Sequence, residues 1–472
     1  MARLRALLTC SAGLEGVLAR ELAQRLGVRA SPFGQRAQPQ SREELHRSGK
    51  LFCTAMTTRQ LYASNVLLRT ADRIFVGAAT FRATSMWELE LACKRLRQGE
   101  LARWLEPARI PLKVRCQVAK SKLWHEAAIA ERVAGFLSKA SSSSDDAEWT
   151  PAPPPDVPRQ LVLLTGLNDV FTVWLDSSGA PLHERGWRDH GGRMPLRSTV
   201  AAGLLYTAGW REGAWGKDAP DIGPKALLDP FAGSGSIPIE AASIAAGLPP
   251  HAADEDGQPT RAFALQLWPS FQPGTWAAVM GDVRKRAASA KACLEGRGAS
   301  MRVVASDRNA AAVRGARGNA RRAGVGDVVE FHEGSFSQGV GAAPPEGCDG
   351  GLLITNPPWG LRSAADDDGD LRSLYAQLGS LVTAPSWRAA IARDEWRLAL
   401  LVHNRAHALM SDRSLEPRLR LTVGGKKAWL MMQGDASRDG RQDEEEEDQW
   451  KGGDRRLVHQ FARPIAGDSG SG

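Results

Sequence analysis

Residues 226–242 read ALLDPFAGSGSIPIEAA, and this stretch decides the fold that we expect. A short apolar run ends at Asp229, a turn of small residues follows, and an apolar helix begins near Ser236. Glycines allow a backbone to approach a ligand closely, and the start of the helix then faces the bound molecule. The turn matches neither G-x-G-x-x-G nor G-x-x-x-x-G-K-[ST], and no lysine follows it, which argues against ATP or GTP. The carboxylate suits a cationic ligand group, and the alternative is a purely structural strand, turn and helix.

Further apolar runs predict parallel strands beside this one. One ends at Asp307, one covers 328–332 and one covers 351–354. We attribute the wide spacing between Asp229 and Asp307 to a loop-rich insertion over 245–300. Asp307 is expected either to accept hydrogen bonds from ribose hydroxyls or to cap the helix that follows it. Alternating strands and helices favour an α/β fold with a doubly wound parallel sheet, in which ligands bind at the carboxyl ends of the strands.

The last of these strands leads into Asn356, Pro357, Pro358 and Trp359. Two prolines fix the backbone and remove two N–H donors, so nearby carbonyl groups stay free, and the asparagine side chain supplies another acceptor. The indole supplies a flat apolar face on which a base can stack. Such a pocket suits an exocyclic amine of a planar base, held through both hydrogens with its nitrogen directed at an electrophile. The alternative is an ordinary turn after a strand, because Asn-Pro is a common turn signal.

The composition predicts an intracellular protein with an anionic partner. Six consecutive acidic residues at 443–448 reduce the formal charge to +8, so the rest of the chain is more basic than the total. An arginine-rich composition without a binding face is the alternative. Six cysteines lie far apart without a C-x-x-C pair, which argues against a zinc or iron–sulfur site and favours a reducing compartment.

We also expect no membrane anchor, since no stretch approaches the roughly 18 apolar residues of a membrane span. The N-terminal residues run directly into a domain and leave no room for a cleavable targeting peptide. A cytoplasmic location is therefore expected, with an organellar or nuclear one as the alternative.

Motifs in both halves resemble one family of enzymes. The segments DPFAGSG (229–235), SD (306–307) and NPPW (356–359) resemble those of S-adenosylmethionine-dependent amino-methyltransferases. The longer segments NPPWGLR (356–362) and LYAQLG (374–379) are similar to those of THUMP-containing RNA guanine-N2 methyltransferases, of the ribosomal RNA large-subunit type. The N-terminal half supports the same resemblance through residues 10–22, 68–74, 121–133 and 176–188.

The resemblance implies four regions. A ferredoxin-like region covers 1–80, and a THUMP-like RNA-binding domain covers 81–184 with a flexible Ser- and Pro-rich insertion at 141–158. A Rossmann-like methyltransferase domain covers 185–433, and an acidic, Gly-rich tail over 434–472 is expected to be disordered. Within the THUMP-like domain, apolar patterns predict helices over 87–97 and 126–138 and strands over 112–118, 161–164 and 170–175.

The resemblance also implies the roles of the site residues. The sulfonium of S-adenosyl-L-methionine would lie across the glycine turn, Asn356 and the Pro357 carbonyl would accept the two amine hydrogens, and Trp359 would stack on guanine. The implied catalytic residues are Asn356, Pro357, Pro358 and Trp359. The implied cofactor-binding residues are Asp229, Pro230, Phe231, Ala232, Gly233, Ser234, Gly235, Asp307, Ser335 and Asn356. This sequence has Ser335 where relatives usually carry an acid, and Trp359 where a tyrosine is more usual. Glu240 is either a carboxylate at the edge of the core or a ligand.

RNA binding is assigned to basic side chains. Lys113, Arg115, Lys120 and Lys122 lie on and after one predicted strand, where they would hold RNA by its backbone or make an edge strand soluble. Arg188, with Arg193 and Arg197, would contact RNA phosphate or form a solvated face.

The resemblance leaves alternatives open. Ribosomal RNA is favoured over transfer RNA as the substrate, and adenine-N6 methylation or a non-catalytic RNA-binding assembly factor are further possibilities. No metal and no membrane partner is implied.

Overall fold

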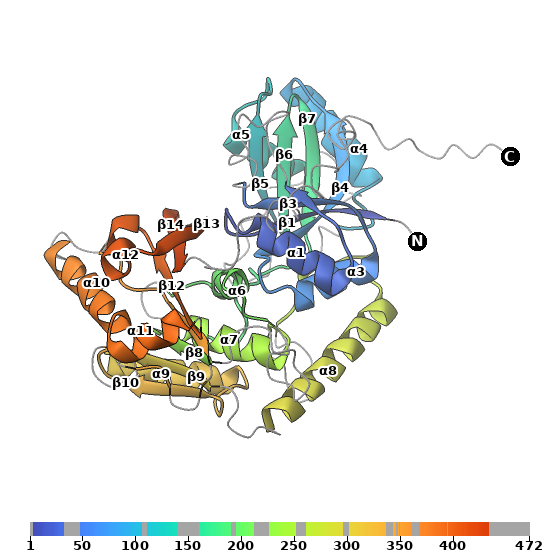
Figure 1. Ribbon diagram of the computed structural model, residues 1–472. Coiled ribbons are helices and arrows are strands. Elements are labelled where there is room, and N and C mark those ends of the chain that lie inside the picture. Colours follow the sequence, from blue (N-terminus) through green and yellow to red (C-terminus); the bar gives the residue numbers. More distant parts are fainter. Residues whose placement is uncertain are drawn as a thin grey trace.

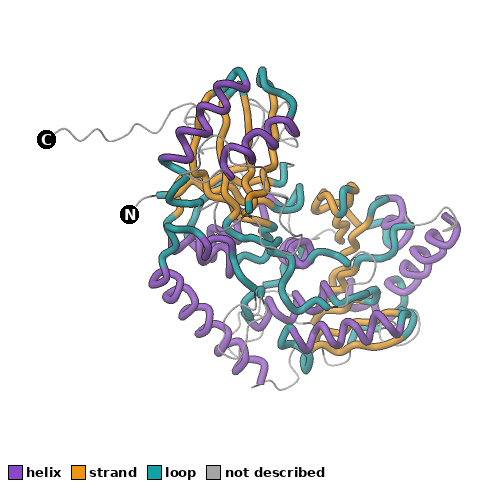
Figure 2. Tube along the Cα trace, turned by 180° about the vertical axis from the view of Figure 1, so that it is seen from behind, coloured by secondary structure: helices purple, strands orange, loops and turns teal. Residues whose placement is uncertain are grey.

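The structure is a computed structural model in which two sheets form two lobes (Figures 1 and 2). It describes residues 3–32, 48–105, 111–138, 160–189, 195–211, 226–251, 261–295, 302–336, 343–345, 348, 350–360, 368–393 and 395–433. The predicted flexible insertion 141–158, the predicted disordered tail 434–472, the final two residues of NPPWGLR and Arg193 lie outside the described residues.

The N-terminal sheet has seven strands, and its strands on both sides of residue 80 are hydrogen-bonded into one sheet. Their order is β2 (Ser31–Pro32), β3 (Lys50–Met56), β1 (Leu4–Thr9), β4 (Arg73–Arg82), β7 (Val170–Asp176), β6 (Gln160–Leu167) and β5 (Leu112–Ala119). Neighbouring strands are antiparallel except β5 and β6. The predicted boundary at residue 80 falls within β4, and the name THUMP for residues 81–184 stays a prediction.

Helices cover one face of this sheet. They are α1 (Glu15–Leu26), α3 (Thr58–Leu67), α4 (Met86–Gln98) and α5 (Glu126–Ser138). The two helices predicted within the THUMP-like domain are thus confirmed, as are the strands predicted over 112–118, 161–164 and 170–175. The apolar stripes of these segments are wide enough to be visible in the sequence, because each helix buries one face against the sheet.

The C-terminal sheet is mixed and has a central parallel part. Its order is β10 (Val329–Glu333), β9 (Arg302–Asp307), β8 (Ala226–Asp229), β11 (Gly351–Thr355), β12 (Trp396–Val402), β14 (Lys426–Gln433) and β13 (Leu415–Val423). The first five strands are parallel, and β14 is antiparallel to both of its neighbours. The chain leaves β8 toward β9 on one side and returns later to β11 on the other. This reversal between β8 and β11 is the switch point at which such sheets bind ligands.

Helices cover both faces of the C-terminal sheet, which confirms the predicted doubly wound architecture. Side chains alternate along each strand, so Leu227 and Leu352 face one helical layer while Leu228 and Leu353 face the other. The first layer contains α6 (Ser198–Thr207), α7 (Ser236–Ala246) and α9 (Ala310–Arg322). The second contains α10 (Asp368–Val382), α11 (Pro385–Ala392) and α12 (Arg405–Ser411).

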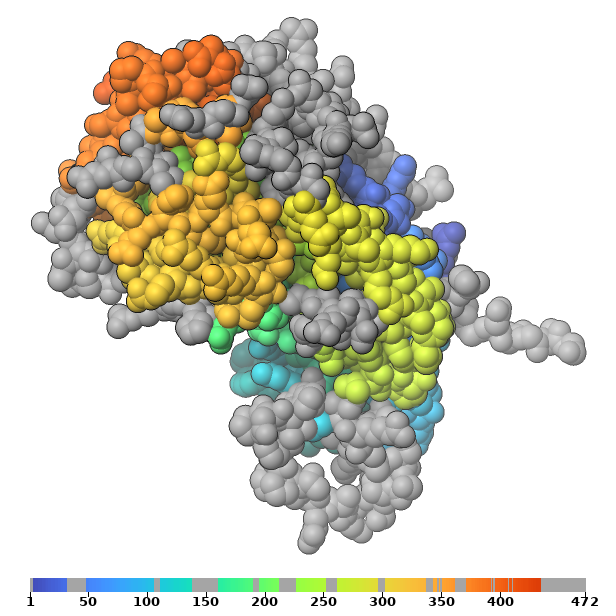
Figure 3. All heavy atoms as spheres, turned by 90° about the horizontal axis from the view of Figure 1, so that it is seen from below, coloured from blue at the N-terminus to red at the C-terminus, as the bar shows by residue number. Residues whose placement is uncertain are grey.

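The prediction of a loop-rich insertion over 245–300 is wrong. This segment contains a short 3-10 helix at Ala264–Leu267 and the 23-residue helix α8 at Pro273–Glu295. The 3-10 helix and the first half of α8 join the core of the N-terminal lobe, whereas Ala290 in the second half of α8 joins the core of the C-terminal lobe. Helix α8 begins beside α3 and runs away from the N-terminal lobe, and its outer face is exposed (Figures 1 and 3). The Trp276 ring lies 5.9 Å from that of Tyr62 on α3. Only four side chains of α8 are buried, so its apolar stripe was too thin to predict a helix.

Among the residues that the structure describes, no helix combines the length and the apolar character that a bilayer span requires. The same residues contain no cluster of three or more His, Cys, Asp or Glu side chains arranged to hold a metal ion.

Candidate active site

The strand ends bring three predicted site segments together at one edge of the C-terminal sheet. Asp229 at the end of β8 accepts a hydrogen bond from Thr355 Oγ1 of β11 at 2.6 Å. Asp307 at the end of β9 accepts one from the backbone N–H of Gly233 at 2.9 Å. Three segments far apart in the sequence therefore surround the switch point, as the parallel strands predicted.

The glycine turn has a backbone that only glycine adopts readily. Gly233 has φ +53° and Gly235, which caps α7, has φ +84°. A Cβ at Gly235 would lie 3.0 Å from Ile239 Cδ1 and 3.2 Å from Ala316 Cβ, so this glycine allows α7 and α9 to pack closely. A Cβ at Gly233 would meet no atom within 4 Å, so this position faces open space. The turn thus has a packed side and a side open to a ligand.

An aromatic pair flanks the turn. The Phe231 ring lies 5.0 Å from the ring of Phe336, which is buried after β10. Ser335 directly before it is exposed at the end of the same strand. The predicted cofactor residues Phe231 and Ser335 therefore lie on the side of the turn that faces β9 and β10.

Arg188 lies beneath the glycine turn. Its guanidinium donates to Ser234 Oγ at 2.9 Å and Ser236 Oγ at 3.0 Å, and it lies 4.8 Å from the Trp187 ring. Burial lowers the pKa of Arg188 to about 10. These contacts support the turn from within the protein, whereas Lys113, Arg115, Lys120 and Lys122 are exposed on the other lobe. The structure does not bring Arg188 together with these four residues, whereas the Arg188 guanidinium donates to the Leu196 carbonyl directly before Arg197.

Asn356 presents a buried acceptor to the site. Its Oδ1 is buried and has no hydrogen-bond partner among the described residues. An unpaired buried acceptor costs about 1–3 kcal/mol, so native structures rarely keep one without a functional reason. Pro357 is buried, Pro358 is exposed, and the Pro358 carbonyl accepts from Tyr375 Oη at 3.3 Å. The side chain predicted to hold an amine thus has a buried acceptor without a partner among the described residues.

Trp359 is fixed by two contacts, one of which the sequence did not predict. Its indole N–H donates to the Leu401 carbonyl at 3.2 Å. One face of the indole stacks on His403, with ring centroids 5.9 Å apart and planes 23° apart. The His403 ring is itself held by Nδ1, which lies 2.6 Å from the Lys427 carbonyl oxygen. His403 belongs to no sequence motif. Its contact with Trp359 becomes visible only in the structure, where the pairing of β12 with β14 places the Lys427 carbonyl beside its ring.

Glu240 is a partner in a buried ion-pair network and does not face the site. Its carboxylate lies 2.9 Å from Arg69 Nη1 and 3.0 Å from Arg185 Nε, and all three side chains are at most 2% exposed. Arg69 precedes β4 in the N-terminal lobe, and Glu240 lies on α7 behind the glycine turn. The network therefore ties the two lobes together next to the candidate site.

Burial changes the ionisation of Asp229. The pKa of Asp229 is raised from 3.8 to about 7, mainly by burial; hydrogen bonds from Thr355 and Phe231 oppose this rise, and nearby Asp307 adds to it. The folded-state pKa thus lies above that of the unfolded chain. The contribution of Asp229 to stability is complete below pH 4 and is lost as the pH rises through 7.

We therefore expect Asp229→Asn to become the more stable protein at higher pH. Between about pH 5 and pH 8, the unfolding free energy of the wild type should fall by roughly 2–4 kcal/mol relative to Asp229→Asn. Asparagine keeps the acceptor oxygen that Thr355 and Phe231 use. Urea unfolding at both pH values measures the difference, and parallel pH profiles of the two proteins would contradict it.

Comparisons with known proteins agree with this architecture. Residues 185–416 match the family model described as RMKL-like, methyltransferase domain. A protein of Syntrophotalea carbinolica named ribosomal RNA large subunit methyltransferase K/L is 35% identical over 257 residues, which are 53% of this chain and 33% of that protein. The match thus spans about a third of the length of this curated relative.

Solved structures share the fold over nearly the whole chain. One described as "a possible methylase from Clostridium difficile 630" has a TM-score of 0.68 at 23% identity, covering 93% of this chain and 100% of that chain. TrmN from Thermus thermophilus has a TM-score of 0.58 at 18% identity, covering 91% and 98%. The resemblance to the ribosomal RNA large-subunit methyltransferases is confirmed, since residues 185–416 of this chain match the RMKL-like methyltransferase domain model.

Proposed function

We propose that this protein transfers a methyl group from S-adenosyl-L-methionine to the exocyclic N2 amine of a guanine in structured RNA. Ribosomal RNA is favoured because the curated relative, which is 35% identical over 257 residues, carries that substrate in its name. The observation that carries the proposal is the buried, unpaired Oδ1 of Asn356 at the switch point of the sheet.

The residues of the switch point fit the proposed cofactor. S-adenosyl-L-methionine supplies a methyl group on a positively charged sulfur. The open side of Gly233 leaves room for a ligand against the backbone, and the Asp229 carboxylate beside it favours a cation. Asp307 at the neighbouring strand end is placed to accept hydrogen bonds from a ribose, while it already accepts one from Gly233 N–H. Phe231 and Phe336 offer an apolar wall for an adenine ring.

The amine of the target base would be held on the other side of the switch point. Asn356 Oδ1 and the Pro357 carbonyl would accept its two hydrogens, which directs the nitrogen lone pair toward the methyl group. Trp359 would stack on the base with the face that His403 leaves free. Positioning supplies much of the rate, because an aligned pair gains on the order of 7–11 kcal/mol over a bimolecular encounter.

A base inside a helix has to leave its stack before it can reach Trp359, so the enzyme needs a hold on the surrounding RNA. Three loops meet at the far end of the N-terminal sheet: Ala83 N–H donates to the Asp169 carbonyl at 3.0 Å, and Lys122 N–H donates to Asp169 Oδ1 at 2.7 Å. Two largely exposed indoles lie close to these loops in the sequence, Trp87 at the start of α4 at 70% and Trp124 in the loop before α5 at 75%. Exposed aromatic rings beside Lys120 and Lys122 are suited to unpaired bases and their phosphates.

We expect Trp124→Ala to weaken RNA binding about ten-fold, since stacking of one base on an aromatic ring contributes roughly 1–3 kcal/mol. The exposure of Trp124 means that folding should not change. Fluorescence anisotropy with a labelled RNA fragment measures the affinity. Leu409→Ala, at an apolar side chain that is 39% exposed on α12, is the matched control. Equal RNA affinities of Trp124→Ala and the wild type would show that the surface around Trp124 does not bind RNA.

The decisive experiment for the reaction uses a labelled methyl donor. The protein is incubated with total RNA that is then separated into ribosomal and transfer pools, and the nucleosides are analysed. N2-methylguanosine in the ribosomal pool is the expected product. Label in N6-methyladenosine, or in the transfer pool alone, would support one of the other two methylation reactions, and no label with intact cofactor binding would favour a non-catalytic RNA-binding factor.

A further inference from the structure

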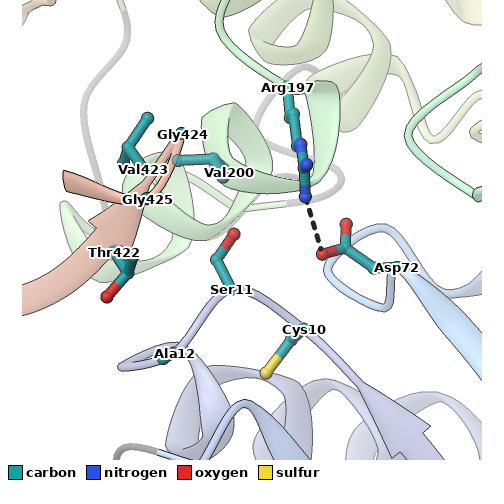
Figure 4. A pocket seen from close by; sticks show the side chains of 10 residues that line it. All are labelled: Cys10, Ser11, Ala12, Asp72, Arg197, Val200, Thr422, Val423, Gly424 and Gly425. Carbon is teal, nitrogen blue, oxygen red and sulfur yellow. Dashed lines mark ion pairs between the residues drawn. The ribbon is translucent and has the colours of Figure 1, made fainter. Parts of the chain in front are cut away.

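A cavity lies where the two lobes meet. It has a volume of about 240 Å³ and is formed by four segments that are far apart in the sequence: the loop after β1, the residue before β4, the start of α6 and the turn between β13 and β14 (Figure 4). Its lining residues are Cys10, Ser11, Ala12, Asp72, Arg197, Val200, Thr422, Val423, Gly424 and Gly425. A backbone hydrogen bond from Thr422 N–H to the Ala12 carbonyl at 2.9 Å holds the turn against the N-terminal lobe.

The cavity contains hydrogen-bond donors that can serve a ligand. Ser11 is only 9% exposed, and its hydroxyl points into the cavity (Figure 4). The hydroxyl has no hydrogen-bond partner among the described residues, whereas the Ser11 carbonyl accepts from Leu14 N–H. The Arg197 side chain is 51% exposed and lies 3.5 Å from Asp72 Oδ2. Asp72 also accepts a hydrogen bond from Thr199 Oγ1 at 2.6 Å, so the only carboxylate of the lining set is already engaged. The Arg197 guanidinium and the Ser11 hydroxyl remain as donors for a ligand, and this pair suits an anion.

The hairpin whose turn lines the cavity is basic. The β13–β14 hairpin carries Arg418, Arg420, Lys426 and Lys427 around the Gly424–Gly425 turn. Of these, Arg418 lies 3.9 Å from Glu416 and Arg420 lies over the Trp429 ring, while both lysines are exposed. The turn itself has no side chains, so a polyanion can approach the cavity along its backbone.

Both neighbours of the cavity belong to the candidate active site. On one side, Arg188 donates to the Leu196 carbonyl at 3.2 Å and to Ser234 Oγ at 2.9 Å, which connects the residue before Arg197 to the glycine turn. On the other side, His403 connects the Lys427 carbonyl to the Trp359 indole. The cavity is therefore linked to the candidate active site through Leu196 on one side and through Lys427 on the other.

We propose that this cavity binds a phosphate of the RNA backbone next to the target nucleotide. The Arg197 guanidinium is its charged donor, and the Ser11 hydroxyl is its second donor. Asp72 is a positioning residue that orients Arg197. The inference rests on the proposed function, because it takes the ligand to be RNA. It adds a subsite that holds the backbone while the base is turned toward Trp359.

The test compares Arg197→Gln, Ser11→Ala and the charge-retaining Arg197→Lys with wild type. Each protein is titrated with a labelled mixed-sequence RNA oligonucleotide between about 50 and 200 mM KCl, because loss of one phosphate contact lowers the salt slope of log Kd by roughly 0.7 for a single strand. We expect about ten-fold weaker binding and this smaller slope for Arg197→Gln, a smaller loss for Ser11→Ala, and recovery of the slope in Arg197→Lys. Arg393→Gln, an exposed arginine before β12 at the opposite edge of the sheet, is the control and should behave like wild type.

Calorimetry with S-adenosyl-L-methionine separates this proposal from the proposed function. Unchanged cofactor affinity in Arg197→Gln with a reduced salt slope supports the subsite. Unchanged RNA affinity and slope in both Arg197→Gln and Ser11→Ala would overturn it, while methylation of guanine by the wild type would still stand. Lost cofactor affinity in Arg197→Gln, or tight binding of inorganic phosphate without RNA, would assign the cavity to another ligand and also overturn it.

Discussion

Replacing Asn356 by alanine is expected to abolish methyl transfer while the affinity for S-adenosyl-L-methionine stays close to that of the wild type. The Asn356 Oδ1 is buried and lacks a partner among the described residues, so its proposed partner is the amine of the substrate. Loss of one positioned hydrogen-bonding group in an active site reduces the rate by about 10²–10³-fold. Transfer of labelled methyl groups to RNA, under single-turnover conditions, measures this effect.

Two companion variants make the result specific. Asn356→Asp keeps an acceptor oxygen but places a charge in a buried position, and it should retain more activity than alanine. Gln377→Ala changes an exposed amide on α10 and should leave the rate unchanged. A wild-type rate of methyl transfer in Asn356→Ala would reject the proposed role of this side chain. A loss of affinity for S-adenosyl-L-methionine of about 10²–10³-fold would show instead that Asn356 binds the cofactor.

The largest effect on stability is expected for Glu240→Ala. The substitution leaves Arg69 and Arg185 buried without their common carboxylate, and both arginines are at most 2% exposed. Removal of one partner from a buried ion pair costs about 3–5 kcal/mol, because the remaining charge is neither solvated nor paired. Urea unfolding measures the difference in free energy.

The matched control is Glu395→Ala, which breaks the surface ion pair with Arg393. Water solvates both members of that pair, so no measurable loss is expected. Glu240→Gln keeps the shape and one acceptor oxygen, and it should lie between the wild type and Glu240→Ala. A stability of Glu240→Ala equal to that of the wild type would show that the network does not hold the lobes together.

The strand ends of the C-terminal sheet were predictable because each signal is local. Asp229, Asp307 and Asn356 each follow a short apolar run, and parallel strands place such residues at one edge. The hydrogen-bond acceptors of Asn356, Pro357 and Pro358 could also be predicted, because the three residues are adjacent in the sequence. Family resemblance extended this to an expected cofactor and substrate.

Features that depend on distant residues could not be predicted. Glu240 lies 171 residues from Arg69, so the sequence indicates an acidic side chain but not its partner. His403 supports Trp359 only because β14 fixes its ring. Likewise, the strands on both sides of residue 80 read as separate units, since the pairing between β4 and β7 that joins them requires the folded sheet.

Helix α8 has a consequence for synthesis of the chain. Its Val279, Met280 and Val283 are part of the N-terminal core, although this core otherwise comes mainly from the first 182 residues. After β7 has been made, the ribosome adds about a hundred residues before α8 is complete, which takes on the order of ten seconds at ~5–20 residues per second. During that delay the nascent N-terminal lobe exposes the apolar surface around Tyr62 that Trp276 later covers. Translation speed over the intervening codons thus sets how long this surface is open to aggregation or to chaperones.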